Sequence, residues 1–179
     1  MKKFLLIIPF LFVTTLFGYS YNDLLIKAQS SIFPKILLLD KKLDEKLVDG
    51  KIVYAIAYDD NDYHTAMQVR KLVENKYKNR LGEYELVIKV IRFSDLSDKT
   101  KVTAVYALNS SDGIDRVSSL AKESGFMTFA YDIENLKHGL LLSLMVEKST
   151  VIYLSKPNLQ NHKVDFVDSL YQLVRFAAN

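Results

Sequence analysis

The stretch that most limits the fold of this chain is KIVYAIAY, residues 51–58, which is almost entirely apolar or aromatic. A strand with apolar side chains at nearly every position must be covered on both faces, as the strands of parallel sheets are. Directly after it, Ala66, Val69 and Val73 recur at three-and-four spacing and predict an amphipathic helix over 60–78. A buried strand followed by such a helix predicts a βαβ crossover, and therefore an α/β domain.

The rest of the chain continues this alternation of strands and helices. The other expected elements are a helix over 21–33 that Pro34 interrupts, a charged surface connection over 40–50, strands over 84–93, 102–108 and 126–132, a helix over 112–125 that Gly125 stops, a hairpin over 139–154 with its turn at 147–149, and an amphipathic helix over 164–176. We therefore expect one three-layer domain, residues 21–179, with a mostly parallel sheet, helices on both faces and a C-terminal hairpin plus helix.

The first twenty residues have the pattern of a secretory signal peptide. Lys2 and Lys3 precede an apolar stretch from Phe4 to Phe17, and Gly18 and Ser20 are small residues placed for cleavage after Ser20. A membrane anchor is the alternative, but an apolar run of about 14 residues falls short of the roughly 20 that span a bilayer. We therefore expect export to the periplasm, with the signal peptide removed.

Composition excludes several classes of function. The chain has 24 basic and 21 acidic residues, and removing Lys2 and Lys3 leaves 22 basic against 21 acidic. Such a nearly neutral domain without a basic cluster is not expected to bind nucleic acid. The chain has no cysteine, which excludes a lipid anchor on cysteine, disulfides, thiol catalysis and zinc-thiolate sites.

Polar residues follow three of the expected strands at the point where each strand ends. In open parallel sheets, ligands bind beyond the carboxyl ends of the strands, near the point where the strand order reverses. The candidate ligand- or partner-binding residues at these ends are Tyr58, Asp59, His64, Asn109, Ser110, Ser111, Tyr131 and Asp132. The tyrosines could stack on a ligand or anchor a partner, or they could fill the rim of the core.

Helix capping is the alternative explanation for several of these polar groups. Asp60 and Asp62 could accept hydrogen bonds from free backbone N–H groups at a helix start, and Ser110, Ser111 and Asp112 could do the same before Ile114. A metal site is disfavoured in YDDNDYHTA, the segment beginning at Tyr58. A calcium loop counted from Asp59 would place His64 and Arg70 where glycine and glutamate are required.

Sequence motifs give no positive indication of an enzyme. The chain has no G-x-S-x-G turn, no H-E-x-x-H helix, no P-loop and no G-x-G-x-x-G fingerprint. His138 and His162 each stand alone in polar segments, so neither suggests a transition-metal site. We therefore expect no catalytic residues, no metal and no cofactor.

The overall pattern resembles the YfiR-like family of exported bacterial proteins. The resemblance is carried by LLIKAQSSIFPKILLLD near the start, IVYAIAYDDNDYHTA in the centre, and FAYDIENLKHGLLLSLMVEKSTVIYL later in the chain. It is closest in VIYLSKPNLQNHKVDFVDSLYQLVRFA, where Asn158 takes the place of an asparagine near the end of a strand and 164–177 takes the place of the last helix. The chain departs from the family in lacking cysteines and in placing Phe33-Pro34 early in its segment.

The resemblance implies a regulator and no catalyst. The family's name-giving member is a periplasmic repressor that binds the outer domain of a membrane diguanylate cyclase, restrains cyclic di-GMP synthesis and often forms dimers. For this chain the resemblance implies a membrane sensor or diguanylate cyclase as partner and a homodimer as an assembly state. The helices expected at 21–33 and 164–176 are the expected protein contacts, because both have apolar stripes. The alternative is a small-solute-binding component of a transporter, because the layout also resembles one lobe of a periplasmic binding protein.

Overall fold

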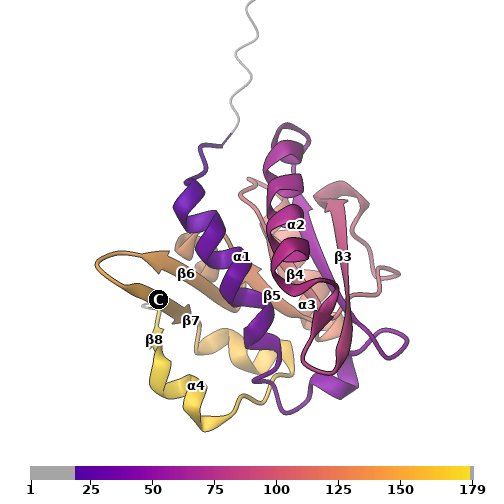
Figure 1. The fold of residues 1–179 in the computed structure, drawn as a ribbon, viewed down its shortest axis with the longest axis vertical. Helices are drawn as coiled ribbons and strands as arrows, with labels where there is room; N and C mark the ends of the chain where they lie inside the picture. Colours follow the sequence, from indigo (N-terminus) through magenta and orange to yellow (C-terminus); the bar gives the residue numbers. More distant parts are fainter. Residues whose placement is uncertain (1–18, 178–179) are drawn as a thin grey trace, which may run out of the picture.

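The domain is built on one eight-stranded sheet. A computed structural model describes residues 19–177 (Figure 1). The strands are β1 (Ile52–Tyr58), β2 (Arg80–Leu81), β3 (Tyr84–Arg92), β4 (Ala104–Ala107), β5 (Met127–Ala130), β6 (Leu142–Val146), β7 (Thr150–Leu154) and β8 (Val174–Phe176). Their order across the sheet is β2-β3-β1-β4-β5-β6-β7-β8. Strands β3, β1, β4, β5 and β6 are mutually parallel, β2 and β7 pair antiparallel with β3 and β6, and β8 pairs parallel with β7.

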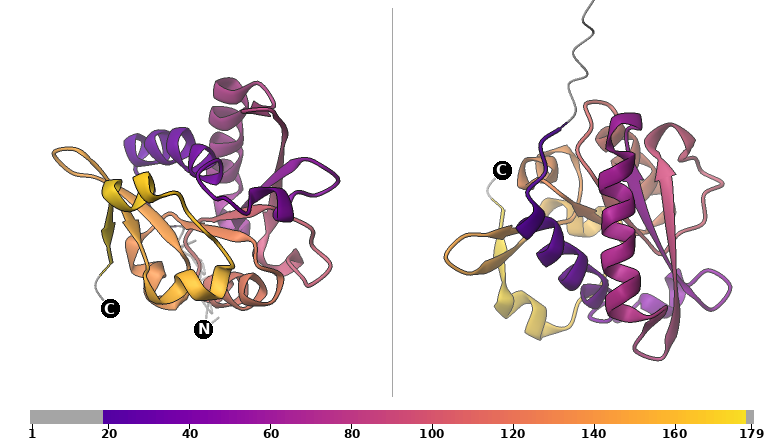
Figure 2. Two further views of the ribbon diagram at one scale, coloured as in Figure 1. Left: turned by 90° about the horizontal axis from the view of Figure 1, so that it is seen from below. Right: turned by 45° about the horizontal axis from the view of Figure 1, so that its top comes forward.

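Helices cover both faces of this sheet, as the sequence predicts. The helices are α1 (Asp23–Leu37), α2 (Tyr63–Tyr77), α3 (Gly113–Ser124) and α4 (Asp168–Leu173), with short 3-10 helices η1 (Leu43–Lys46), η2 (Asp60–Asp62), η3 (Phe93–Asp95), η4 (Ile133–His138) and η5 (Pro157–His162). Helices α1 and α2 lie side by side on one face, and α3 packs on the other against β4, β5, η4 and η5 (Figures 1 and 2). The predicted three-layer α/β domain is therefore confirmed.

Each face of the sheet has its own apolar core. On the α1–α2 face, Tyr54, Tyr106 and Phe129 from three neighbouring strands pack with Phe33 of α1. The opposite core packs α3 against smaller side chains such as Ala55 of β1. All seven residues of β1 are buried, as a strand covered on both faces requires.

Helix α1 continues past Pro34, which contradicts the predicted interruption after Phe33. Asn22 caps the helix, its side chain accepting a hydrogen bond from the backbone N–H of Leu25 at 3.0 Å. Pro34 is buried inside the helix, which runs on to Leu37. Because Phe33, Ile36 and Leu37 all pack in the core, burial of this last turn outweighs the backbone hydrogen bond that proline removes.

The predicted helix over 164–176 is mostly wrong. Only α4 is helical, and 174–176 instead form strand β8 beside β7, with Ile152 opposite Val174. The apolar residues Val174 and Phe176 also fit the two-residue period of a strand. Without β8, strand β7 would present an unpaired edge, so pairing with it satisfies backbone groups that a helix would leave exposed.

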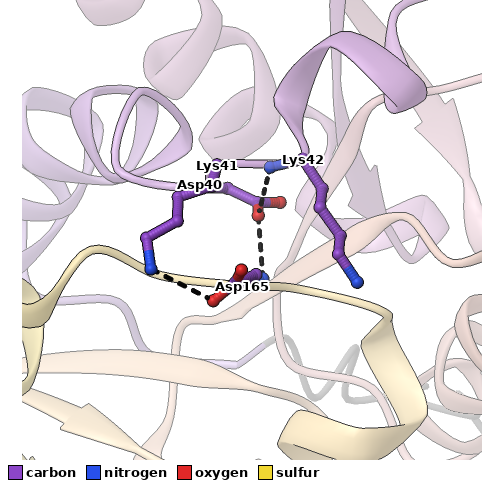
Figure 3. Close-up of polar contacts among 4 residues, drawn as sticks. All are labelled: Asp40, Lys41, Lys42 and Asp165. Atoms are coloured by element: carbon purple, nitrogen blue, oxygen red, sulfur yellow. Dashed lines mark hydrogen bonds and ion pairs between the residues drawn. The ribbon is translucent and has the colours of Figure 1, made fainter.

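Ahead of α4 the chain is held extended by Asp40, in the connection predicted to be merely a surface segment. The Asp40 carboxylate is buried and accepts hydrogen bonds from the backbone N–H groups of Lys42 (3.1 Å) and Asp165 (2.9 Å), as Figure 3 shows. Its second oxygen pairs with the ammonium group of Lys46. Lys41 adds a backbone hydrogen bond to the carbonyl oxygen of Asp165, at 2.8 Å. This Asp40 clamp joins the α1–β1 connection to the C-terminal segment.

The predicted signal peptide lies almost wholly outside the described residues, since only Tyr19 and Ser20 belong to both. Between residues 19 and 177, none of the helices has both the length and the apolar content to cross a bilayer.

Candidate functional site

The carboxyl ends of β1, β4 and β5 meet at one edge of the sheet, as predicted. Ala57 pairs with Ala107, and Ala107 pairs with Ala130, so the residues that follow these three strands are neighbours. After β1 the chain crosses to β3 on one side and then returns to β4 on the other. The strand order therefore reverses between β1 and β4, where ligands bind in open α/β sheets. We call this region the carboxyl edge.

Tyr21, just ahead of α1, lies across the carboxyl edge. Its hydroxyl donates a hydrogen bond to Asp62 Oδ2 at 2.8 Å and accepts one from the backbone N–H of Asn109 at 3.1 Å. Its ring packs edge-on against Tyr131, with 4.7 Å between ring centroids. The Tyr131 hydroxyl in turn accepts a hydrogen bond from the backbone N–H of Asn22 at 2.8 Å. Tyr21 and Asn22 thus form hydrogen bonds with the polar groups at the carboxyl edge.

Burial changes the acidity of both members of the Tyr21–Asp62 pair. It raises the pKa of Tyr21 far above its usual value, and the hydrogen bond to Asp62 raises it further. Burial also raises the pKa of Asp62, while the hydrogen bond from Tyr21 acts in the opposite direction. The phenol of Tyr21 therefore stays neutral near neutral pH and donates its proton in the hydrogen bond to Asp62.

Two of the predicted site residues, Asn109 and Tyr131, contact Tyr21 directly. The side-chain oxygen of Asn109 also accepts a hydrogen bond from Asn135 at 3.2 Å. Asp132 is half-buried beside them, and its Oδ1 accepts a hydrogen bond from the backbone N–H of Glu134 at 3.0 Å. These contacts tie the end of β4 to the start of η4.

The remaining predicted residues form a looser outer group. Tyr58 is buried and its ring lies 5.7 Å from that of Tyr63, centroid to centroid. His64 is exposed, with its ring 6.2 Å from the same Tyr63 ring, while Asp59 is half-buried and Ser111 is exposed. None of these side chains makes a hydrogen bond to Tyr21 within residues 19–177.

The capping hypothesis holds for one serine and for none of the three aspartates; Asp112 precedes α3 but makes no capping hydrogen bond. Ser110 Oγ accepts a hydrogen bond from the backbone N–H of Gly113, at 2.8 Å, and so caps α3. Asp62 precedes α2 but makes no capping hydrogen bond, because its carboxylate binds Tyr21. Asp60 pairs with Arg92 at 3.0 Å. Across residues 19–177, no group of three or more His, Asp or Glu side chains is placed to hold a metal ion.

A cavity of about 550 Å³ lies elsewhere, on the α3 face of the sheet. It is bounded by η4, the end of β7, the start of η5 and the residue after β8. The residues lining this Tyr153 cavity are Ile133, Glu134, Leu136, Lys137, Tyr153, Ser155, Pro157, Asn158 and Ala177. Its volume is within the range of small-molecule sites, about 300–1,000 Å³.

A series of hydrogen-bonded buried polar groups lies next to the Tyr153 cavity and begins at Asn158. The side-chain nitrogen of Asn158 donates to the carbonyl oxygens of Leu136 (2.9 Å) and Leu140 (2.8 Å). The backbone carbonyl oxygen of Asn158 lies 2.8 Å from Nδ1 of His162, which is completely buried. Nε2 of His162 lies 2.8 Å from Thr128 Oγ1. Burial lowers the pKa of His162 to about 4, so this ring is neutral at physiological pH.

No pattern in the sequence indicates the Tyr153 cavity. Its walls come from three segments far apart in the chain, and half-buried residues such as Ile133 and Tyr153 carry no distinctive pattern. Only Asn158 was singled out, through the family resemblance. Tyr21 was also missed, because nothing in its own segment indicates a contact with Asp62, 41 residues away.

Comparison with known proteins gives a fold but no family. Neither a family profile nor a curated protein matches the sequence. Among solved structures, the chain resembles a conserved domain protein from Vibrio cholerae O1 biovar El Tor, with 12% identity, a TM-score of 0.58, and coverage of 86% of this chain and 60% of that one. The YfiR-like resemblance is not tested by these matches.

Two further similar structures are described in terms of ligand binding. One is an ABC domain in complex with L-Trp from Streptococcus pneumoniae, with 12% identity, a TM-score of 0.54, and coverage of 80% of this chain and 60% of the other. The other is a ligand-free, open substrate-binding protein with adhesive properties from Clostridium difficile, with 14% identity, a TM-score of 0.54, and coverage of 77% and 58%. This chain therefore spans about three fifths of the length of these proteins.

Proposed function

We propose that this chain is an exported, non-enzymatic binding protein that holds a small solute in the Tyr153 cavity. The observation that carries the proposal is the cavity itself, about 550 Å³ bounded by apolar walls and a few convergent polar groups. A concave, mostly apolar site of this size is the usual form of a small-molecule pocket. At the carboxyl edge, by contrast, the corresponding polar groups are engaged by Tyr21.

The fold similarity supports a binding role of this kind. One similar structure holds L-Trp and another is a substrate-binding protein. Periplasmic binding proteins close two domains around the ligand by a hinge motion. The described residues form a single sheet, and we place the ligand within this domain, in the Tyr153 cavity.

The proposal is tested by thermal unfolding in the presence of a metabolite panel. A ligand present at about 100 times its Kd should raise the unfolding free energy by about 2.7 kcal/mol. The substitution Ala177→Trp, which fills the Tyr153 cavity, should abolish this stabilisation. Lys71→Trp is the matched control, because Lys71 is exposed on α2, on the other face of the sheet, and should leave the response unchanged.

Two results would contradict the proposal. One is that no compound stabilises the unaltered protein. The other is that Ala177→Trp responds to the same ligand as strongly as Lys71→Trp, which would place the binding site outside the Tyr153 cavity.

Exposed apolar side chains near the C-terminus favour a second candidate function, regulation of a membrane sensor or diguanylate cyclase. Leu173 is 68% exposed and Phe176 is 50% exposed, and Tyr171 is exposed beside them. Large exposed apolar side chains that gather in one place mark protein contact sites. These side chains lie in the segment 164–176, whose apolar stripe predicts protein contact.

Crosslinking in the periplasm tests the regulatory proposal. If it holds, Leu173→Ser should reduce recovery of a membrane sensor, while Leu38→Ser, at an exposed leucine just after α1, should not. Deleting the gene should change the intracellular cyclic di-GMP level if the partner is a cyclase. Recovery of no membrane protein, together with an unchanged nucleotide level, would contradict this second proposal.

A further inference from the structure

We propose that the ligand of the Tyr153 cavity is a neutral, largely apolar ring compound that carries at least one N–H or O–H donor. This inference rests on the proposed binding function and specifies the chemical class of its ligand. It is carried by the hydrogen-bonding state of two buried side chains, Ser155 and Asn158, and by the charges at the rim.

The side-chain oxygen of Asn158 is a hydrogen-bond acceptor that no described donor group reaches. The residue is buried, with 9% of its surface exposed. Both partners of its amide nitrogen are carbonyl oxygens, those of Leu136 and Leu140, which fixes the orientation of the amide, because the flipped amide would set oxygen against oxygen. Its Oδ1 atom receives no hydrogen bond from residues 19–177. A ligand donor can satisfy this oxygen.

Ser155 offers a second unused polar atom at the same cavity. The residue is buried, and its backbone N–H donates to the carbonyl oxygen of Leu141 at 2.9 Å. Its hydroxyl makes no hydrogen bond within the described part of the chain, although a hydroxyl can both donate and accept. Both residues line the same cavity, and a few convergent polar groups among apolar walls are what orients a ligand in such a site, so these two atoms point to a polar ligand group between them.

The rim of the cavity disfavours a charged ligand. Lys137 and Glu134 lie on the rim and pair with each other at 2.6 Å, so neither sign of charge is left over. Deeper in the cavity, Ser155 and Asn158 are uncharged. An ion placed there would lose hydration without gaining an opposite charge, which is strongly unfavourable.

The apolar walls favour a flat ring. The Tyr153 ring lines one part of the cavity, and Ile133 and Pro157 line other parts. Aromatic rings pack well against such surfaces in stacked or edge-on arrangements. A carboxamide on a benzene ring fits all three requirements, because it is flat, neutral and able to donate to Asn158 while accepting from Ser155.

The test is an NMR titration of the full chain with three matched probes. Benzamide carries the donor, N,N-dimethylbenzamide lacks it, and benzoate is charged. Benzamide should bind at least about tenfold more tightly than either analogue, which is the ratio that one hydrogen bond gives. Ser155→Ala should weaken benzamide binding by about tenfold, whereas Ser119→Ala, at an exposed position on α3, should leave it unchanged.

The outcomes test the proposed ligand class separately from the proposed binding function. If the dimethylated analogue or benzoate binds as tightly as benzamide, the proposed class is wrong, although the cavity still binds a solute. If none of the three probes shifts the resonances of Ser155 or Asn158, the proposed class is also overturned, and the metabolite panel with Ala177→Trp then decides separately whether the cavity binds anything.

Discussion

The hydroxyl group of Tyr21 lies 2.8 Å from Asp62 Oδ2 and donates a hydrogen bond to it, joining the segment ahead of α1 to the start of α2. Asp62 is only 4% exposed, so this hydrogen bond replaces much of the water that its carboxylate loses on folding. The same hydroxyl accepts from the backbone of Asn109 at the end of β4. One side chain thus fastens the N-terminal segment over the point where the strand order reverses.

Removing this hydroxyl should destabilise the protein. Tyr21→Phe leaves a buried carboxylate and a backbone N–H without their partner, and we expect a loss of about 2 kcal/mol of unfolding free energy. Tyr63→Phe is the matched control, because Tyr63 is exposed and its substitution should change stability by less than about 0.5 kcal/mol. Urea unfolding of both variants measures the difference. Equal stability of the two variants would show that the Tyr21 contact contributes nothing.

Substitution of a second buried side chain, Gln29, should lower the unfolding free energy even more than Tyr21→Phe does. Its amide nitrogen donates to the carbonyl oxygens of Tyr131 (2.8 Å) and Leu144 (2.9 Å), and its oxygen accepts from the Tyr106 hydroxyl at 2.5 Å. Gln29→Met has nearly the same shape but leaves three polar groups unpaired. We expect a loss of at least about 3 kcal/mol.

Gln68→Met is the control for this substitution. Gln68 makes one exposed hydrogen bond, to Asp23, so its loss should have little effect on stability. Urea unfolding of the two methionine variants is the measurement. A Gln29→Met variant as stable as Gln68→Met would contradict the role assigned to the buried amide.

The buried imidazole of His162 should make stability depend on pH. Its pKa is lowered by burial to about 4 in the folded protein, against about 6.5 in the unfolded chain. Between these values the unfolded state binds more protons, so stability is complete above pH 6.5 and falls as the pH falls towards 4. The expected loss is about 3 kcal/mol, at 1.36 kcal/mol per pKa unit.

Urea unfolding at pH 7.5 and pH 4 tests the assignment to His162. The control His138→Gln should keep the full pH dependence, because His138 is exposed. His162→Gln should be less stable at pH 7.5, but its stability should fall about 3 kcal/mol less on acidification. If His162→Gln and His138→Gln lose the same stability between the two pH values, another group is responsible.

The Asp40 clamp gives a prediction about the C-terminal segment. Asp40→Asn removes the partner of the buried Lys46 ammonium group, and breaking a buried ion pair in this way costs about 3 kcal/mol. Amide hydrogen exchange should accelerate at Asp165 and Val167, whose N–H groups bond to the side chain of Asp40 and the backbone of Leu39.

Asp49→Asn, at an exposed turn, is the control for the Asp40 clamp and should leave exchange at both amides unchanged. Unaltered exchange in Asp40→Asn would mean that the clamp does not hold the segment.

The central sheet could be predicted from the sequence because its signals are local. The apolar run of β1 and the polar turn between β6 and β7 each specify their structure within a few residues. Gly125 ends α3 in the left-handed conformation, at φ +80°, as a glycine at a helix C-terminus commonly does. These elements therefore lie close to their expected positions.

Features that depend on distant contacts could not be predicted in the same way. Val164, Val167 and Leu170 have helical spacing in the sequence, but only α4 within this segment is helical. The residues after α4 pair with β7 and form a strand instead. Pro34 lies within α1 because its neighbours are buried against strands that come much later in the chain. Local propensity is overridden in both places by tertiary packing.

In the candidate site, too, the features set by local sequence could be predicted and those set by distant contacts could not. The strand ends do meet, as the parallel order requires, but Tyr21 fills the place between Asp62 and Asn109. No pattern in the sequence specifies the Tyr153 cavity, which exists only once η4, η5 and β8 come together.

Intermolecular NOEs between a bound ligand and the protein test the central claim most directly. With a compound that stabilises the protein, we predict NOEs from the ligand to the methyl groups of Ile133 and to the ring of Tyr153. NOEs to the rings of Tyr58 and Tyr131 instead would place the ligand at the carboxyl edge, and would contradict the assignment of the binding site to the Tyr153 cavity.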